Sequence, residues 1–199
     1  MKEFWNNRYT DEKFVFGFNP NKFFKAQLDL LPTGKLLLFG EGEGRNAVYA
    51  ASEGWDTLAL DWSEKAKEKA LMFARKNNVL FRYEVGSFFD IPVEHDSFDA
   101  AALIYIHLKE EDRELLHKKA VTSLKVGGTL ILEAFDKEQL GRTSGGPQDI
   151  EQLYSLENIV NDFQDLEFKY FAKETLQLDE GNGHVGEACV VRFSGIKQK

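Results

Sequence analysis

Residues 35–46 read KLLLFGEGEGRN, and this stretch decides the fold. The apolar run 35–39 ends at a glycine and predicts a buried strand, and the helix after it is expected to begin near Gly44 and to stop at Gly54. Glycines at Gly40, Gly42 and Gly44 let the backbone turn sharply and approach a ligand at the carboxyl end of the strand. The stretch therefore predicts a ligand-binding turn in an α/β fold.

From residue 35 onward, short apolar runs alternate with helical patterns, which is typical of strand-helix-strand units in a parallel sheet. The last two apolar segments flank Gly181-Asn182-Gly183 and predict an antiparallel pair. The glycine-rich segment 141–147 is expected to be a loop. Strands are expected at residues 35–39, 57–61, 80–85, 98–105, 129–135, 166–178 and 187–193, and later helices from Ser63 to about 77, at 109–124 and near 153–163. The pattern predicts a doubly wound sheet with an antiparallel edge.

The segment before the sheet, residues 1–31, is rich in aromatic side chains, among them Trp5, Tyr9 and Phe16. It is expected to form a helical cap over one sheet edge, a lid over the ligand, or both. The chain is interpreted as one domain, 1–199, with the cap or lid at 1–31 and the sheet core at 35–199.

Composition narrows the classes of protein. Lysine and arginine number 25 and aspartate and glutamate 33, so the net charge of −8 opposes binding to nucleic acid or anionic lipid. The single Cys189 cannot form an internal disulfide, and the four histidines lack metal-ligand spacing, so no metal is expected. The longest apolar run, 100–106, is far shorter than the roughly 20 residues of a membrane span, and no secretion segment is evident. We expect a soluble, cytoplasmic monomer or homodimer that binds a small molecule.

The residues of the turn discriminate between nucleotide ligands. A dinucleotide fingerprint requires glycine where Arg45 stands, and a phosphate-binding loop requires a lysine and a hydroxyl that are missing. Glu41 and Glu43 would each repel a pyrophosphate at about 6 Å by roughly 3 kcal/mol at an effective dielectric of about 20. S-adenosylmethionine instead brings an ammonium and a sulfonium to these carboxylates, and its own carboxylate suits the helix amino terminus. The sequence therefore predicts S-adenosylmethionine as the cofactor.

Residues after the next two strands complete the predicted cofactor site. Asp61 ends the second strand 21 residues after Gly40, a spacing suited to ribose hydroxyls, although an aspartate there can also cap a helix. Trp62 offers an aromatic face for adenine or belongs to the core, and the segment Ser87-Phe88 faces the adenine edge or is an ordinary loop. The other expected cofactor contacts are Gly40, Glu41, Gly42, Gly44, Arg45, Asn46, Ser63 and Ile104.

Eight short motifs are spread over nearly the whole chain. They are 5–9 (WNNRY), Gly17 with 20–21 (PN), 42–48 (GEGRNAV), 61–63 (DWS), 97–99 (SFD), 107–108 (HL), 124–128 (LKVGG) and 145–147 (GGP). Through these motifs the chain resembles the class I S-adenosylmethionine-dependent methyltransferases, and within them the tellurite-resistance methyltransferases. The resemblance implies a three-layer, Rossmann-like fold with a seven-stranded sheet of order 3-2-1-4-5-7-6 and the cofactor over strands one, two and four.

Two positions depart from the family pattern. Leu38 stands where the family has an acidic residue two positions before the first glycine, so the methionine ammonium is expected to use Glu41 or a backbone carbonyl. Ser87 replaces the aspartate that commonly contacts the adenine amine. These departures leave open a protein that binds S-adenosylmethionine without catalysis.

Methyl transfer from a sulfonium mainly requires alignment and exclusion of water. Thiols, selenols and oxyanions need no strong base, whereas hydroxyls and amines do. The acceptor is expected to be a small nucleophile of this kind, and methylation of nucleic acid is the less favoured reading because of the negative charge. The candidate catalytic residues are Tyr105, His107, Arg142 and His184, although His107 can equally be structural and Arg142 a solvated loop charge. His95 and His117 are expected at the surface, and Cys189 in the core.

Overall fold

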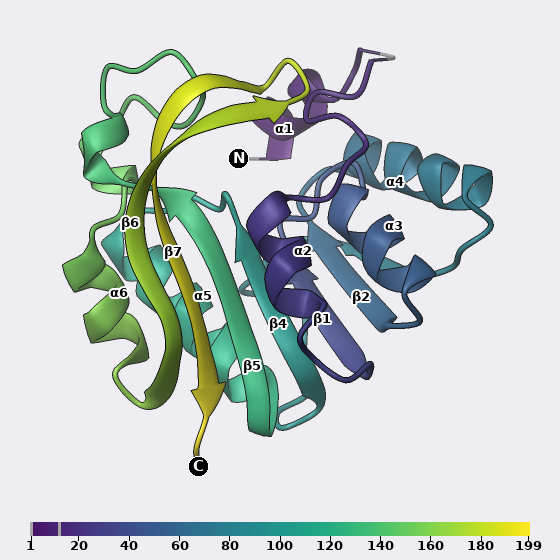
Figure 1. Ribbon diagram of the computed structural model, residues 1–199. Coiled ribbons are helices and arrows are strands. Elements are labelled where there is room, and N and C mark those ends of the chain that lie inside the picture. The colour runs from purple at the N-terminus through teal and green to yellow at the C-terminus, as the bar shows by residue number, and fades with distance from the viewer. Residues whose placement is uncertain (1, 12) are drawn as a thin grey trace.

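Residues 2–11 and 13–199 are described by a computed structural model, in which a seven-stranded sheet lies between two layers of helices (Figure 1). The strands are β1 (Lys35–Phe39), β2 (Asp56–Asp61), β3 (Arg82–Val85), β4 (Phe98–Ile104), β5 (Leu124–Phe135), β6 (Leu166–Glu180) and β7 (His184–Lys197). The helices are α1 (Lys2–Arg8), α2 (Lys22–Leu28), α3 (Arg45–Ser52), α4 (Glu64–Lys76), α5 (Glu110–Ser123) and α6 (Leu156–Phe163).

The strand order is β3-β2-β1-β4-β5-β7-β6, which confirms the predicted order. Strands β1 to β5 pair in parallel, and β7 pairs antiparallel with both β5 and β6. The third strand begins at Arg82 rather than Leu80, whose side chain is 89% exposed. The last two strands are longer than expected and continue to Glu180 and from His184, so only three residues separate them.

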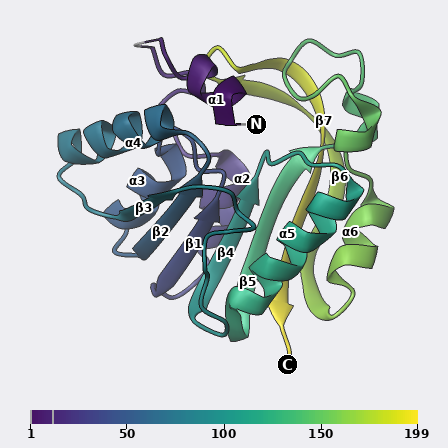
Figure 2. The same cartoon turned by 180° about the vertical axis from the view of Figure 1, so that it is seen from behind.

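Alternate side chains of β1 point to opposite faces of the sheet and belong to two separate hydrophobic cores. Leu36 and Leu38 pack against α2, α3 and α4, whereas Leu37 and Phe39 belong to the core under α5 and α6. Figure 2 shows α5 and α6 on the face opposite to α2. Because both faces are covered, β1 is apolar along its length, as a central parallel strand requires.

His117 lies on α5, and its predicted surface position is wrong. Its side chain is 2% exposed, and Nδ1 lies 2.7 Å from a carboxylate oxygen of Asp162 on α6. Arg113 donates from Nε to the same carboxylate at 2.8 Å. The many charged residues of α5 suggested an exposed helix. The contact that buries His117 could not be predicted locally, because Asp162 lies 45 residues further along the chain.

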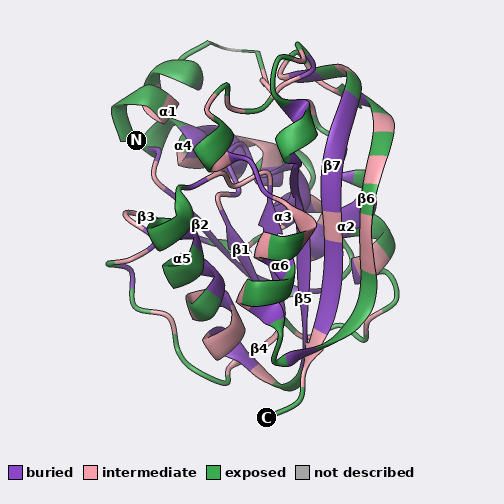
Figure 3. Ribbon diagram, turned by 90° about the vertical axis from the view of Figure 1, so that its left-hand side faces the viewer, coloured by how far each residue is buried: buried purple, intermediate pink, exposed green. Residues whose placement is uncertain are grey.

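The β6–β7 hairpin bends over the carboxyl ends of the parallel strands and meets the N-terminal segment (Figure 1). The Gly183 amide donates to the Val15 carbonyl at 2.8 Å. A Cβ on Gly181 would lie 2.4 Å from the Gly17 nitrogen, so the close approach requires glycine. Figure 3 shows that β7 is mostly buried while β6 is largely exposed. The hairpin and the N-terminal segment together cover the end of the sheet where the glycine-rich turn lies.

Helix α1 is packed differently from the helices of the two layers. None of its residues is buried, and it touches the remainder of the molecule mainly through α4. None of the helices in the described residues is long and apolar enough to cross a membrane.

Candidate functional site

A pocket of about 420 Å³ lies at the carboxyl ends of β1, β2 and β4. This volume falls within the range of about 300 to 1,000 Å³ that is typical of small-molecule sites. The predicted residues that line it are Gly40, Glu41, Gly42, Arg45, Asn46, Asp61, Trp62, Phe88, Ile104, Tyr105, His107 and His184. Four other predicted residues, Gly44, Ser63, Ser87 and Arg142, do not line it.

The glycine-rich turn is held in backbone conformations that only glycine adopts freely. Gly40 and Gly42 have φ angles of 59° and 63°. A Cβ on Gly40 would lie 2.8 Å from a side-chain carbon of Ile106, and one on Gly42 would lie 2.8 Å from the Tyr9 hydroxyl. Gly44 allows close packing between the turn and α4, because a Cβ on Gly44 would lie only 2.8 Å from the Cβ of Ala70. The turn leaves open backbone along one wall of the pocket.

Glu41 lines the pocket but directs its carboxylate to the start of α3. One oxygen accepts hydrogen bonds from the backbone amides of Asn46 at 2.8 Å and Ala47 at 2.7 Å. Burial raises the pKa of Glu41 to about 7, although these hydrogen bonds oppose the shift. The sequence analysis expected the amides at the start of α3 to bind the carboxylate of the cofactor. Two of these amides, those of Asn46 and Ala47, instead donate to Glu41.

Glu43 does not face the pocket, so the prediction that both carboxylates of the turn meet the ligand is wrong for this residue. Its carboxylate pairs with the Lys69 ammonium at 2.7 Å and accepts the Val15 amide at 2.7 Å. Both side chains of the ion pair are at least nine-tenths buried. These contacts hold the turn against α4 and the N-terminal segment. The Lys69 ammonium neutralises the negative charge of Glu43, which the sequence analysis had expected to face the ligand.

Asp61 lines the pocket at the end of β2. One oxygen accepts the Gly42 amide at 2.9 Å and the other accepts the Ser63 amide at 2.9 Å. Burial raises the pKa of Asp61 to about 6, against these backbone hydrogen bonds. Each oxygen keeps a further lone pair for a ligand hydroxyl.

Ser63 and Ser87 were predicted to contact the cofactor, and both are used locally instead. The Ser63 hydroxyl caps α4 by accepting the Ala66 amide at 3.1 Å and donates to the Asn6 side chain at 2.7 Å. The Ser87 hydroxyl accepts the amide of Phe89 at 3.2 Å. Short polar side chains next to a helix start or a turn satisfy nearby backbone groups first.

Trp62 and Phe88 form the aromatic part of the pocket wall near Asp61. Their ring centroids are 5.3 Å apart, with an angle of 61° between the ring planes. The Trp62 Nε1 atom is buried and has no hydrogen-bond partner among the described residues. A buried donor without a partner is rare, and a bound ligand would satisfy it.

At the other end of the pocket, His107 is tied to the backbone by both ring nitrogens. Nδ1 lies 2.9 Å from the Gln152 carbonyl, and Nε2 accepts the Phe135 amide at 3.3 Å. Burial lowers the pKa of His107 to about 4. Its ring therefore has no free nitrogen, and the prediction of a catalytic role is wrong for His107.

Arg142 lies outside the pocket, which corrects its predicted role in holding substrate. Its guanidinium pairs with Glu187 and donates from Nε to the Glu138 carbonyl at 3.2 Å. The loop 141–147 still reaches the pocket, but through Gly146 and Pro147.

Tyr105 follows β4 and lines the pocket with a left-handed backbone, φ 55°. Its hydroxyl is buried and has no hydrogen-bond partner with good geometry among the described residues. Burial, together with the nearby carboxylates of Glu133 and Glu180, raises the pKa of Tyr105 well above 10. The phenol therefore stays protonated and can donate to a ligand.

His184 begins β7 and packs its ring against Tyr105, Phe16 and Phe135, with centroid distances of 4.4, 4.7 and 5.2 Å. Nδ1 lies 3.2 Å from a carboxylate oxygen of Glu180. Nε2 makes no hydrogen bond within the described part of the chain. Among the candidate histidines of the pocket, His184 keeps a nitrogen for chemistry.

Several pocket residues were not named individually as site residues from the sequence. Phe4, Arg8 and Phe16 come from the N-terminal segment, for which the aromatic content and the motif at 5–9 gave only the general expectation of a cap or lid. Tyr9 is 5% exposed and stacks on Trp5 at 5.6 Å. No local pattern indicates these contacts, because they form only when the segment folds over the sheet.

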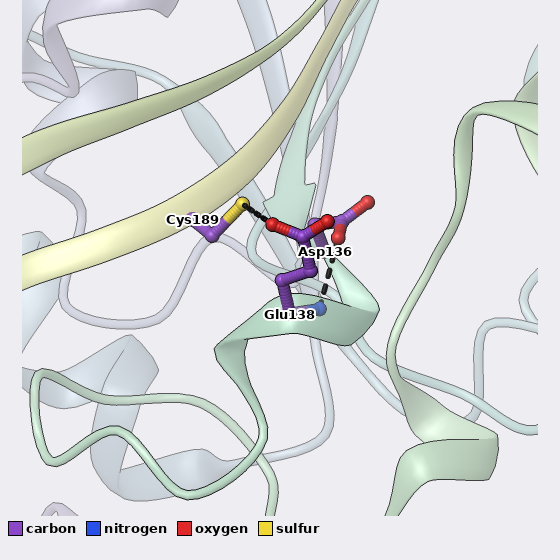
Figure 4. Close-up of side chains that lie close together, drawn as sticks. All are labelled: Asp136, Glu138 and Cys189. Carbon is purple, nitrogen blue, oxygen red and sulfur yellow. Dashed lines mark hydrogen bonds between the residues drawn. The ribbon is translucent and has the colours of Figure 1, made fainter.

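A second group of side chains lies outside the pocket, where Asp136, Glu138 and Cys189 approach one another (Figure 4). Asp136 accepts the Glu138 amide at 2.9 Å, and Glu138 pairs with Lys173 at 2.5 Å. Cys189 is 1% exposed, and burial raises the pKa of its thiol. The contacts explain the cluster as a packing of β7 against the turn after β5.

Comparisons with known proteins agree with this architecture. Residues 37–132 match the family described as a methyltransferase domain. No curated protein matches the chain in sequence. A structure from work on converting a disulfide bond into a thioacetal group during echinomycin biosynthesis has a TM-score of 0.82 and 12% identity, covering 100% of this chain and 92% of the other.

Two further structures share the fold. TehB from Haemophilus influenzae has a TM-score of 0.75 and 15% identity, covering 99% of this chain and 67% of TehB. Phosphoethanolamine N-methyltransferase 2 from Haemonchus contortus, in complex with phosphomonomethylethanolamine and S-adenosylhomocysteine, has a TM-score of 0.67 and 18% identity, covering 98% and 57%. The domain match over residues 37–132 and the sheet order support a class I methyltransferase with S-adenosylmethionine as its cofactor.

The pocket fits this cofactor in three respects. The open backbone at Gly40 and Gly42 would be filled by any side chain, the lone pairs of Asp61 suit ribose hydroxyls, and the buried Trp62 Nε1 needs an acceptor. When bound, S-adenosylmethionine supplies a methyl group that is already activated for transfer.

Proposed function

We propose that the chain transfers a methyl group from S-adenosylmethionine to a small-molecule nucleophile, such as a thiol or an oxyanion of selenium or tellurium. The pocket carries this proposal, because it continues from Gly40 and Asp61 to an aromatic end walled by Tyr105, Phe135 and His184. One cavity therefore offers neighbouring places for a methyl donor and a small acceptor. Its volume of about 420 Å³ and the net charge of −8 favour a small molecule over a nucleic acid.

The residues divide into two groups with different roles in this proposal. Asp61 accepts the ribose hydroxyls, and Trp62 and Phe88 flank the adenine. Tyr105 donates a hydrogen bond at the acceptor end, where His184 removes a proton if the acceptor carries one. The reaction is an in-line displacement, so the main task of these residues is to align donor and acceptor and to exclude water.

Helix α1 acts as a lid in this proposal, whereas α2 stays packed on the sheet as a cap. Phe4, Trp5 and Arg8 of α1 line the pocket, yet no residue of α1 is buried. The Asn6 side chain holds α1 to the start of α4 by accepting from the Ser63 hydroxyl at 2.7 Å. A helix fastened by so few contacts can leave at low cost and admit ligands to the pocket.

The motifs that resemble the tellurite-resistance methyltransferases, together with the fold shared with TehB, support testing tellurite first among the oxyanions. The echinomycin-related structure supports testing thiols, because the work that describes it concerns a disulfide and a thioacetal. Both likenesses are below 25% identity, so the choice of acceptor rests on experiment.

The test is the release of S-adenosylhomocysteine in the presence of thiols, selenite, tellurite and small acids. We expect at least one acceptor to raise the rate above the background. Asp61→Ala should weaken S-adenosylmethionine binding by about 10-fold or more, since it removes hydrogen bonds to a ligand and to the turn. Asp56→Ala is the matched control, because Asp56 begins the same strand and is exposed.

Two outcomes would argue against the proposal. Tight binding of S-adenosylmethionine without turnover on any acceptor would favour a binding protein that lacks catalysis. Affinity for nucleic acid that falls with salt would favour a macromolecular acceptor.

A further inference from the structure

Glu180, at the end of β6, is held from three directions beside the pocket. The Arg45 guanidinium donates to one of its oxygens at 3.0 Å, and the Asn21 amide donates to the other at 3.1 Å. His184 approaches the first oxygen through Nδ1 at 3.2 Å. The side chains of Glu180, Arg45 and His184 are all at least nine-tenths buried.

The surroundings fix the charge of this carboxylate. Burial alone would raise the pKa of Glu180, but the hydrogen bond from His184 and the charge of Arg45 bring it to about 2. Glu180 is therefore ionised near neutral pH and can only accept hydrogen bonds. The His184 nitrogen that faces it must then carry the proton.

The tautomer of His184 follows from this contact. A neutral imidazole has one protonated nitrogen, so a proton on Nδ1 leaves a lone pair on Nε2. Nε2 makes no hydrogen bond within the described residues, and the ring lines the pocket. This arrangement is that of a carboxylate orienting a histidine base.

Resting on the function proposed above, we infer that Glu180 is a positioning residue for His184 and that the acceptor enters as a neutral, protonated nucleophile of the thiol class. An oxyanion or a thiolate needs no base, whereas a thiol that is still protonated must lose its proton, and for this a weak base such as the His184 imidazole suffices. The proton of the S–H group passes to Nε2 while a sulfur electron pair forms the new bond to the methyl carbon. The bond between that carbon and the sulfonium breaks, and its electron pair stays on the departing thioether.

Other charged and titratable groups around His184 do not replace Glu180. Burial and the charge of Arg45 disfavour a charged imidazole and oppose Glu180, so that the pKa of His184 is lowered, whereas Glu133 favours the charged form but is paired with Arg192 at 2.5 Å. Tyr105 contacts the ring and stays protonated. Glu180 is thus the described carboxylate in hydrogen-bonding distance of Nδ1.

The first test needs no acceptor. A long-range proton–nitrogen NMR spectrum of the unsubstituted protein at pH 7.5 or so should show His184 as the Nδ1–H tautomer, assigned by loss of its signals in His184→Gln. Glu180→Gln should abolish the clear preference for this tautomer, whereas Glu167→Gln, an exposed change on the same strand, should leave it intact. A proton on Nε2 in the unsubstituted protein would overturn the inference.

The second test separates positioning from a purely structural role. With 2-mercaptoethanol, which is mainly protonated near neutral pH, Glu180→Gln should lower kcat/KM by about 10- to 100-fold, which is at or below the lower end of general-base effects because His184 itself remains. With 4-nitrobenzenethiol, which is already a thiolate, the loss should be at most about threefold. An equal loss with both thiols would overturn the inference.

The two proposals fail in distinguishable ways. If neither thiol is methylated, thiol acceptors are excluded and the inferred acceptor class fails with them, while turnover of tellurite or selenite would still support methyl transfer. If thiols are methylated but His184 carries its proton on Nε2, the proposed methyl transfer is supported and the inferred role of Glu180 is rejected. Glu180→Asp, which keeps the charge, provides a second variant should Glu180→Gln fold poorly.

Discussion

Gly145 lies against the imidazole of His184, and its lack of a side chain sets the place of that ring. Its φ is 124°, and a Cβ would lie 2.5 Å from the His184 Cδ2 atom. Gly145→Ala should therefore displace the ring and lower turnover by about 10-fold or more, with little change in S-adenosylmethionine affinity. Kinetics and calorimetry on the same preparations measure the two effects.

The control for this change lies in the same loop. Gly141 also has a positive φ, 82°, but a Cβ there would meet nothing within 4 Å. Gly141→Ala thus carries the backbone strain without the contact. Equal turnover in the two variants would contradict the assigned place of His184.

A change at Gly42 tests the end of the pocket where the cofactor is expected to bind. A Cβ there would lie 2.8 Å from the Tyr9 hydroxyl and beside the pocket. Gly42→Ala should weaken S-adenosylmethionine binding by about 10-fold, as measured by calorimetry. Gly127→Ala is the matched control, because Gly127 has a φ of 83° and an added Cβ would have no neighbour within 4 Å. Unchanged affinity in Gly42→Ala would remove the turn from the cofactor site.

At the scale of elements, one buried carboxylate joins α5 to α6. Asp162 is 3% exposed at its side chain and bonds both Arg113 and His117. Although burial alone would raise the pKa of Asp162, hydrogen bonds from these two partners hold it below its usual value. Asp162→Asn should cost about 3 kcal/mol of unfolding free energy, because it leaves Arg113 buried without its charge partner.

Urea unfolding measures this cost, with Asp165→Asn as the control, since Asp165 is exposed on the neighbouring turn. The lowered pKa implies that the stabilisation is present above about pH 4 and is lost as the pH falls through the folded-state pKa. A cost that stays constant down to about pH 3 would show that charge pairing is not its source.

At the scale of the whole molecule, the two ends of the pocket respond to pH in opposite directions. The pKa of His107 falls from 6.5 to about 4, so the unfolded chain binds its proton first and stability is lost as the pH drops below 6.5. The pKa of Glu41 rises from 4.5 to about 7, so its protonation stabilises the fold below pH 4.5 and this contribution is lost as the pH rises through 7.

Two variants separate these contributions. The stability difference between the unsubstituted protein and His107→Gln should be larger at about pH 7 than at about pH 4.5, by about 2 kcal/mol. The difference for Glu41→Gln should change in the opposite sense, being larger at about pH 4.5 than at about pH 8. Urea unfolding across this range measures both, and parallel pH curves would contradict the assigned environments.

The local sequence determined the order of elements and the glycine-rich turn at the pocket. Apolar runs of strand length and the glycines of residues 40–44 act within a few residues of one another, so both were predictable, whereas the sheet order was expected from the family resemblance. Asp61 and Trp62 follow a strand end, and strand ends of a parallel sheet meet at one edge.

Only the tertiary structure decided which side chains remain free to act. Glu43 looked like a ligand group until Lys69 neutralised it, and His107 looked like a base until backbone groups of distant segments took both nitrogens. Glu180 gave no signal, because its partner Arg45 lies 135 residues away in the chain. The physical reason is that hydrogen bonds and burial set the charge and availability of a group, and both depend on neighbours that the sequence does not place.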